Sequence, residues 1–309
     1  MHPRVAGPEA LAEAAAVLRD GGIVAVPTET VYGLAARADS DAGVAAIFRA
    51  KGRPSFNPLI VHVADRAAGE PLAHFDDRAR ELAAAFWPGA LTLVVPRRAN
   101  AGLAPAISAG LPTVALRCPA HPMMRALLAE CGFPLAAPSA NRSGAISPTS
   151  AAHVAASLGA RIGLILDGGE CVAGLESTIV ALRDDGSWSL LRPGPIVRAQ
   201  IAAILGADRE ATPTGGIEAP GQLASHYAPS KPLRLDAISA ESDEFLIGFG
   251  DLSGHTSLSQ DGNLAEAAAR LYRCLHEADA AASTRIAVAR VPESGIGAAI
   301  NDRLRRAAS

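Results

Sequence analysis

The sequence predicts an α/β protein with a twisted mixed sheet covered by helices, followed by a smaller, Rossmann-like α/β unit. Short apolar runs of strand length alternate with amphipathic segments of helix length. Several of the predicted strands follow one another directly, which is typical of a mixed sheet and not of a purely parallel one. With 309 residues, 49% of them hydrophobic, the chain is long and apolar enough for two domains with buried cores.

Helices are predicted where apolar residues recur at helical spacing behind a capping residue such as Ser40 or Ser150. The predicted helices span residues 8–18, 40–49, 76–86, 122–130, 150–158, 264–280 and 298–307. Strands are predicted for β-rich runs that are bounded by Gly, Pro and polar residues. These runs are residues 23–26, 59–63, 91–95, 113–117, 134–137, 162–166, 178–182, 188–191, 244–250 and 285–291.

A change in composition divides the chain. Between residues 206 and 232 the hydrophobic periodicity disappears, and Gly, Pro, Thr and Ala dominate. A stretch of this length without its own elements is usually a linker or a functional loop. We therefore expect an N-terminal domain of residues 1–205, a linker of residues 206–232 and a C-terminal α/β domain of residues 233–309.

Composition excludes several classes of protein. A formal net charge of −3 and an aromatic content of 4% argue against a protein that mainly coats nucleic acid. The four cysteines form no C-x-x-C pair, so we expect reduced thiols and no zinc site. Charged residues interrupt the apolar residues near the N-terminus, and no run is apolar enough to span a bilayer. The expectation is a cytoplasmic protein without membrane association.

Lys51 and Arg53 are the sharpest local feature. The chain has only two lysines, Lys51 and Lys231, while it uses arginine freely. A lysine ammonium can bind a phosphate oxygen as a point charge, and Gly52 would let the backbone approach such a ligand. The alternative is a solvated helix C-terminus, where basic residues are favoured by the helix dipole. The residues alone leave both interpretations open.

Hydroxyl and amide side chains crowd the turn 138–148, which follows a predicted buried strand. They can form a site for phosphate or sugar oxygens, or they can serve only as turn and cap residues. Two arginines, Arg117 and Arg192, end strands at the sheet edge where α/β proteins bind ligands. Together with Lys51 and Arg53 they predict a cationic pocket. In the linker, His226 and Tyr227 are interpreted either as a docking element or as a buried anchor.

Several motifs occur in an order typical of one family. In sequence they are PTETVYGL, KGRPSFNPLIVHV, WPGALTLVV, APSANRSGAISPT, LESTIV, LRPGPI and, in the linker, PGQLASHYAPSKP. This series closely resembles the YrdC-like family, in particular its two-domain threonylcarbamoyl-AMP synthases. The resemblance implies a YrdC-like fold for the N-terminal domain. It also implies an enzyme, a nucleotidyltransferase that condenses L-threonine, bicarbonate and ATP to threonylcarbamoyl-AMP and pyrophosphate.

The resemblance also implies site residues, carried over by motif position. The catalytic residues would be Lys51, Arg53, Ser139 and Asn141. L-threonine would bind at Thr30, His62, Arg117, Ser177 and the backbone of Ala137. ATP would bind at Arg53, Asn57, Thr113, Ser139, Ser147, Arg192 and Tyr227. No residue is assigned to a metal, because Mg²⁺ is expected to arrive with the triphosphate and to keep its waters.

The implied partners follow from the implied product. Threonylcarbamoyl-AMP would pass to proteins that transfer the threonylcarbamoyl group to adenosine 37 of tRNA, with at most weak tRNA contact by this chain. Three other classes remain as alternatives: a non-catalytic RNA-binding module, a carbamoyl-transfer enzyme of the hydrogenase-maturation type, and a Rossmann redox enzyme. The second would need zinc-finger cysteines and an acylphosphatase region. The third would rest on incomplete glycine motifs at residues 248–254 and 295–297.

Overall fold

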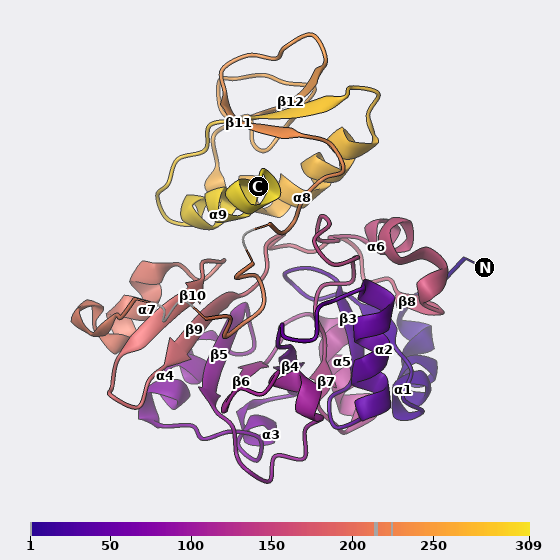
Figure 1. Cartoon of the computed structure of the whole chain (residues 1–309), viewed down its shortest axis with the longest axis vertical. Coiled ribbons are helices and arrows are strands. Elements are labelled where there is room, and N and C mark those ends of the chain that lie inside the picture. Colours follow the sequence, from indigo (N-terminus) through magenta and orange to yellow (C-terminus); the bar gives the residue numbers. More distant parts are fainter. Residues whose placement is uncertain (1, 213–215, 224) are drawn as a thin grey trace.

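The computed structural model describes residues 2–212, 216–223 and 225–309. A large domain carries a mixed sheet of ten strands in the order β1-β8-β2-β3-β7-β4-β6-β5-β9-β10, and a smaller domain lies against one end of it (Figure 1). The strands of the large sheet are β1 (Arg4–Ala6), β2 (Val24–Val26), β3 (Gly33–Arg37), β4 (Ile60–His62), β5 (Leu91–Pro96), β6 (Thr113–Arg117), β7 (Leu135–Ala136), β8 (Leu164–Leu166), β9 (Thr178–Leu182) and β10 (Trp188–Arg192). Parallel and antiparallel pairs alternate irregularly along this sheet, so the predicted mixed sheet is confirmed.

Helices cover both faces of the large sheet. The helices of this domain are α1 (Leu11–Arg19), α2 (Asp41–Lys51), α3 (Arg66–Gly69), α4 (Asp77–Phe86), α5 (Pro122–Cys131), α6 (Ala151–Leu158) and α7 (Arg198–Leu205). The pleat of β2 explains the two layers: Val24 and Val26 pack with α1 and α5, whereas Ala25 packs with α2 and α6 on the other face. Ser40 caps α2 and Ser150 caps α6 as predicted, each accepting a backbone N–H from three residues further on.

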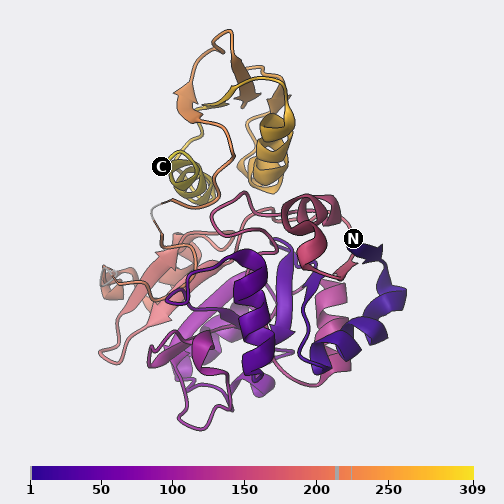
Figure 2. The same ribbon diagram turned by 45° about the vertical axis from the view of Figure 1, so that its right-hand side comes forward.

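The C-terminal domain has a parallel sheet of four strands in the order β11-β14-β12-β13. Its strands are β11 (Leu233–Ala237), β12 (Glu244–Gly248), β13 (Thr256–Ser257) and β14 (Arg285–Ala289). Its helices, α8 (Leu264–Ala280) and α9 (Gly297–Ala307), lie between this small sheet and the large domain (Figures 1 and 2). The C-terminal domain therefore meets the large domain through helices and not through its sheet.

Several helices and strands of the structure are not predicted by the sequence patterns. Among them, β3 is a buried strand of Gly, Leu, Ala and Arg, residues with little strand propensity of their own. It forms because β2 and β7 pair with it on either side. The short strands β1 and β13 and the helices α3 and α7 were also missed, as was β11, which pairs with β14. A 3₁₀ turn at Ala207–Arg209 occupies part of the predicted linker.

Apart from that turn, the described part of residues 206–232 has no helix or strand. Residues 213–215 and 224 of the predicted linker lie outside the described residues. Within the described parts of the chain, no helix combines the length and the apolar composition needed to cross a bilayer.

Candidate functional site

A cavity that contains many polar and charged side chains lies where several strands of the large sheet end, and the linker covers it. Adjacent parallel strands β4 and β6 place His62 and Arg117 opposite each other in register. The turn before β3, the turn after β7 and the loop before β9 supply further polar groups. The cavity is lined by Thr28, Thr30, Val31, Gly33, Arg53, Ile60, His62, Arg117, Ala137, Pro138, Ser139, Glu176, Ser177, Arg192, Pro220, Gly221, His226 and Tyr227.

The structure brings most of the predicted ligand-binding residues to this cavity. All five residues assigned to L-threonine line it, as do Arg53, Ser139, Arg192 and Tyr227 from the set assigned to ATP. Five other candidates do not line it: Lys51, Asn57, Thr113, Asn141 and Ser147. Four of these five are buried; Thr113 is half-buried at the start of β6.

Arg117 forms a buried ion pair with Glu29. Its Nη2 donates to Oε1 of Glu29 at 2.6 Å, and its Nη1 donates to Oγ1 of Thr30 at 2.9 Å. The backbone N–H groups of Ala120 and His121 donate to the other oxygen of Glu29. Burial raises the pKa of Glu29, but the charge and hydrogen bond of Arg117, together with backbone N–H groups, outweigh burial and keep that pKa below its usual value. Arg117 is therefore held rigidly, with its remaining N–H groups free for a carboxylate of a ligand.

His62 is a neutral histidine at the threonine end of the proposed site. Burial, with a smaller contribution from Arg117, lowers the pKa of His62 to about 3, so its imidazole is uncharged at neutral pH. Its Nδ1 is buried and has no hydrogen-bond partner among the described residues. A buried polar atom without a partner is costly in an empty site. We interpret it as a hydrogen-bonding position for a ligand.

Arg53 and Arg192 supply cationic charge that no carboxylate neutralises directly. Both are buried, and within the described residues neither has an acidic side chain within ion-pair distance. Arg53 instead donates to the carbonyl oxygens of Asn57 and Pro58. Arg192 donates to the carbonyl and hydroxyl oxygens of Ser177 at 3.0 and 3.1 Å. Burial lowers the pKa of Arg53 to about 10, which still leaves it charged at neutral pH. These charges suit an anionic ligand such as a triphosphate.

Lys51 has a role that the sequence did not suggest. It is buried, and its Nζ donates to the carbonyl oxygens of Ser139 and Asn141 at 2.5 and 2.6 Å. Burial, and then the charge of Arg53, lower the pKa of Lys51 well below its ordinary value. The side chain therefore ties the end of α2 to the turn that presents Ser139 to the cavity. The interpretation of Lys51 as part of a solvated helix end is wrong.

Two carboxylates were not singled out as site residues from the sequence. Glu29 positions Arg117, and Glu176 lines the cavity beside Ser177. Both residues stand inside the family motifs PTETVYGL and LESTIV, but nothing in these motifs indicates that an anion pocket would contain acids. Ser147 was assigned to ATP, yet its Oγ donates to Oε1 of Glu176 at 2.5 Å.

The linker closes the cavity with buried side chains. Tyr227 is 1% exposed and His226 7% exposed, which agrees with a buried anchor. The Tyr227 hydroxyl and Nδ1 of His226 have no hydrogen-bond partner among the described residues. Gly221 is required where it is, because a Cβ there would lie 2.7 Å from the Tyr227 hydroxyl. The free space left is about 40 Å³, enough for a few waters but far too small for a nucleotide.

Comparison with known proteins adds to this geometry. A family model described as telomere recombination matches residues 16–194, and one described as the C-terminal domain of threonylcarbamoyl-AMP synthase matches residues 196–309. The threonylcarbamoyl-AMP synthase of Bacillus subtilis (strain 168) is 42% identical, over 96% of this chain and 92% of its own length. The chain belongs to the threonylcarbamoyl-AMP synthase family. The resemblance seen in the sequence motifs is thus confirmed.

The solved structures agree with this assignment to the threonylcarbamoyl-AMP synthase family. The crystal structure of Pyrococcus abyssi Sua5 complexed with L-threonine matches with a TM-score of 0.89 and 35% identity, covering 99% of this chain and 97% of that one. The threonylcarbamoyl-AMP synthase of the same organism is 38% identical over 95% of this chain. These full-length matches confirm the predicted fold class and favour the synthase over the three alternative classes considered above.

Proposed function

We propose that this protein is an L-threonylcarbamoyladenylate synthase, which condenses L-threonine, bicarbonate and ATP to threonylcarbamoyl-AMP and pyrophosphate. In addition to family membership, the arrangement of charged and neutral side chains in the cavity supports this proposal. A single cavity holds a rigid arginine beside a neutral histidine, and next to them two arginines without acidic partners among the described residues. The first pair suits an amino acid, and the second pair suits a polyphosphate.

L-threonine would bind where β4 and β6 end. Arg117 would bind its carboxylate, since the guanidinium is already fixed by Glu29 and Thr30. The unpartnered Nδ1 of His62 and the hydroxyl of Ser177 would bind its polar groups. The carboxylate would thus be fixed while the amine faces the reacting carbon.

ATP would bind on the side of the cavity that Arg53, Ser139 and Arg192 line. Both carboxylates nearest the cavity, Glu29 and Glu176, are paired with arginines. Within the described ranges of the chain, the side chains therefore offer no cluster of acidic, histidine or cysteine ligands for a metal. We propose that Mg²⁺ enters with ATP as its counter-ion, bound mainly to phosphate oxygens and water.

The chemistry needs positioning more than covalent catalysis. The uncharged threonine amine attacks carbon dioxide, with loss of a proton to solvent, or bicarbonate, with loss of water, to give a carbamate. A carbamate oxygen then attacks the α-phosphorus of ATP in line, and pyrophosphate leaves. The protein has to hold the two substrates together and neutralise the charge that develops on the phosphate oxygens. Arg53 and Arg192 can do this without accepting or donating a proton.

One assay tests the proposed function. The purified protein is incubated with L-threonine, bicarbonate, ATP and Mg²⁺, and the products are examined by mass spectrometry. We expect pyrophosphate and a new adenylate with the mass of threonylcarbamoyl-AMP, formed only when all three substrates are present. Pyrophosphate that appears without threonine, or no adenylate at all, would contradict the proposal.

The pocket is expected to prefer threonine to serine and serine to valine. Valine has nearly the shape of threonine but lacks the hydroxyl, so a polar group such as Nδ1 of His62, which has no partner among the described residues, would stay unpaired, at about 1–3 kcal/mol per group. Serine keeps the hydroxyl and loses one methyl, worth about 1 kcal/mol of apolar burial. Competition between the amino acids for adenylate formation measures the order. If valine competes better than serine, the pocket recognises shape, and its polar groups are wrongly assigned.

The linker is expected to act as a lid. Because it leaves no room for a nucleotide in its present position, it has to open for ATP to enter and then close over it. We expect limited proteolysis between residues 206 and 232 to slow when ATP and threonine are saturating. Residues 213–215 and 224 of this stretch lie outside the described residues, so cleavage is to be mapped by mass spectrometry. An unchanged cleavage rate would count against a lid.

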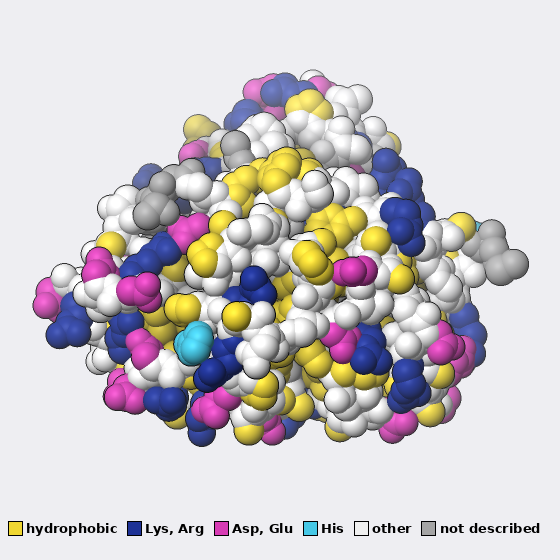
Figure 3. All heavy atoms as spheres, turned by 60° about the horizontal axis from the view of Figure 1, so that its bottom comes forward, with side chains coloured by type: hydrophobic (Ala, Val, Ile, Leu, Met, Phe, Trp, Pro, Cys, Tyr) yellow, Lys and Arg dark blue, Asp and Glu magenta, His cyan; other side chains and the backbone are white. Residues whose placement is uncertain are grey.

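We further propose that the adenylate passes to separate proteins that transfer the threonylcarbamoyl group to tRNA. We place this reaction in the cytoplasm. All four cysteines are buried free thiols, which is typical of proteins in a reducing compartment. Contact with tRNA by this chain would be weak. On the face shown in Figure 3, basic and acidic side chains are interspersed, without the broad basic patch expected of a nucleic-acid-binding surface. Filter binding of tRNA with and without ATP would test this.

A further inference from the structure

Glu176 connects the active-site cavity to the C-terminal domain. Its carboxylate accepts the Ser147 hydroxyl from the large domain and the Tyr272 hydroxyl from α8, the latter at 2.8 Å from Oε2. It also accepts Nε of Arg303, from α9, at 2.8 Å. Arg303 is fully buried, and Glu176 is 6% exposed and lines the cavity. The acid next to the proposed ATP site is thus neutralised by a residue 127 positions away, in the other domain.

Arg303 also contacts the loop that follows Arg192. Its Nη2 donates to the carbonyl oxygen of Pro193 at 3.0 Å. Arg303 therefore contacts Glu176, the residue before Ser177, and Pro193, the residue after Arg192. Ser177 and Arg192 both line the cavity and are hydrogen-bonded to each other. The two loops are tightly packed, because a Cβ on Gly194 would lie 2.5 Å from the backbone nitrogen of Thr178. A shift of either loop would move the Ser177–Arg192 pair.

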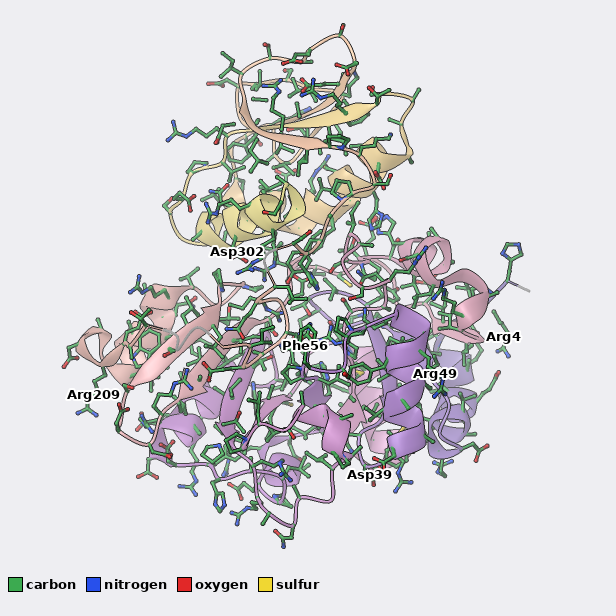
Figure 4. The ribbon with its side chains drawn as sticks, viewed as in Figure 1. Arg4, Asp39, Arg49, Phe56, Arg209 and Asp302 are labelled. Atoms are coloured by element: carbon green, nitrogen blue, oxygen red, sulfur yellow. The ribbon has the colours of Figure 1, made fainter. Side chains whose placement is uncertain are left out.

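The helix α9 holds Arg303 in this position and contacts the linker as well. Asp302, labelled in Figure 4 on the side of α9 that faces the large domain, accepts Nη1 of Arg303 at 2.6 Å. The Arg303 guanidinium lies 5.2 Å from the centre of the Tyr227 ring. Arg306, three residues further along α9, accepts the backbone N–H of His226 through its carbonyl oxygen. The helix α9 therefore contacts Glu176, the loop that contains Pro193 and, through His226, the linker.

Charge makes the contact with Arg303 necessary. An unpaired carboxylate at Glu176 would repel both the triphosphate and the threonine carboxylate in a buried, poorly screened cavity. Burial alone would raise the pKa of Glu176, but Arg303, followed by Arg192, lowers it to about 2. The acid is therefore ionised at neutral pH, and its charge has to be balanced by an arginine.

We propose that Arg303 and Tyr272 of the C-terminal domain are positioning residues for the adenylation site: they neutralise Glu176 and thereby keep Arg192 and Ser177 available to ATP and threonine. This inference rests on the proposed function. It assigns the C-terminal domain an indirect part in ATP binding, because both residues act through Glu176 and neither lines the cavity.

The test compares ATP binding, measured by calorimetry without threonine, in four full-length variants. Arg303→Met removes the charge and should weaken ATP binding by about tenfold or more, because it leaves a buried carboxylate unpaired. The double variant Glu176→Gln/Arg303→Met removes both charges and should bind ATP within about threefold of wild type. Tyr272→Phe keeps the ring and loses one hydrogen bond to Glu176, so a weakening of about two- to fivefold is expected. Arg305→Met, on the same helix but in an exposed pair with Glu293, is the matched control and should bind like wild type.

The double variant decides between positioning and simple domain docking. If Arg303 only held the domains together, the double variant would bind ATP as weakly as Arg303→Met, and the proposal would be overturned. Normal ATP binding by Arg303→Met would overturn it too. If Arg303→Met does not fold, as thermal unfolding would show, ATP binding by the double variant remains decisive. Wild-type protein that makes no adenylate would refute the proposed function instead, so the two failures are distinguishable.

Discussion

Replacing Arg117 with methionine should raise the KM for L-threonine by about a hundredfold or more, the largest effect that we expect at the threonine end of the cavity. The substitution removes the cation for the substrate carboxylate. It also leaves Glu29 buried without the partner that lies 2.6 Å from it, so the remaining charge repels the substrate. The KM for ATP should change much less, because Arg53 and Arg192 are untouched. Steady-state kinetics with each substrate varied in turn measures the difference.

Loss of fold has to be separated from loss of binding in this experiment. Breaking a buried ion pair destabilises a protein by about 3–5 kcal/mol. Arg117→Lys keeps the charge but loses the planar guanidinium that can donate two parallel hydrogen bonds to a carboxylate. This variant should fold while raising the KM for threonine by about tenfold. Arg125→Met, on the exposed side of α5, is a control that should behave like wild type. Equal increases in both KM values would place Arg117 outside the threonine site.

Removing Lys51 should have the second large effect. Lys51→Ala, like Arg53→Ala, is expected to lower turnover tenfold or more, equivalent to about 1.4 kcal/mol or more of lost transition-state stabilisation. For Lys51 the reason is indirect: without its Nζ, the turn that carries Ser139 and Asn141 loses two hydrogen bonds and moves relative to the cavity. Single-turnover adenylate formation at saturating substrates measures the change.

The other lysine of the chain provides a matched control. Nζ of Lys231 also donates to two carbonyl oxygens, those of Ala278 and Ala281, but near the end of α8 and away from the cavity. Lys231→Ala should therefore keep normal turnover even if it lowers the thermal stability. Near-normal turnover in Lys51→Ala would remove Lys51 from the mechanism.

Local chemistry made much of the fold predictable. The predicted bounds of α8 agree with the structure, and α2 and α6 begin at their predicted serine caps, because capping and helical periodicity are properties of neighbouring residues. The strand β3 was missed for the opposite reason. Its Gly, Leu and Ala residues form a strand only because β2 and β7 pair with it.

The sequence by itself determined the fold class and the family, and it predicted half of the residues that line the candidate site, since the motifs that carry these residues are short and contiguous. Only the tertiary structure decided what the charges do. Lys51 is bound to backbone carbonyl oxygens, Glu29 holds Arg117, and Glu176 is paired with Arg303 from the other domain. The physical reason is that a charge in a buried site acts through whichever groups surround it, and chain folding brings those groups together from positions 88–127 residues apart.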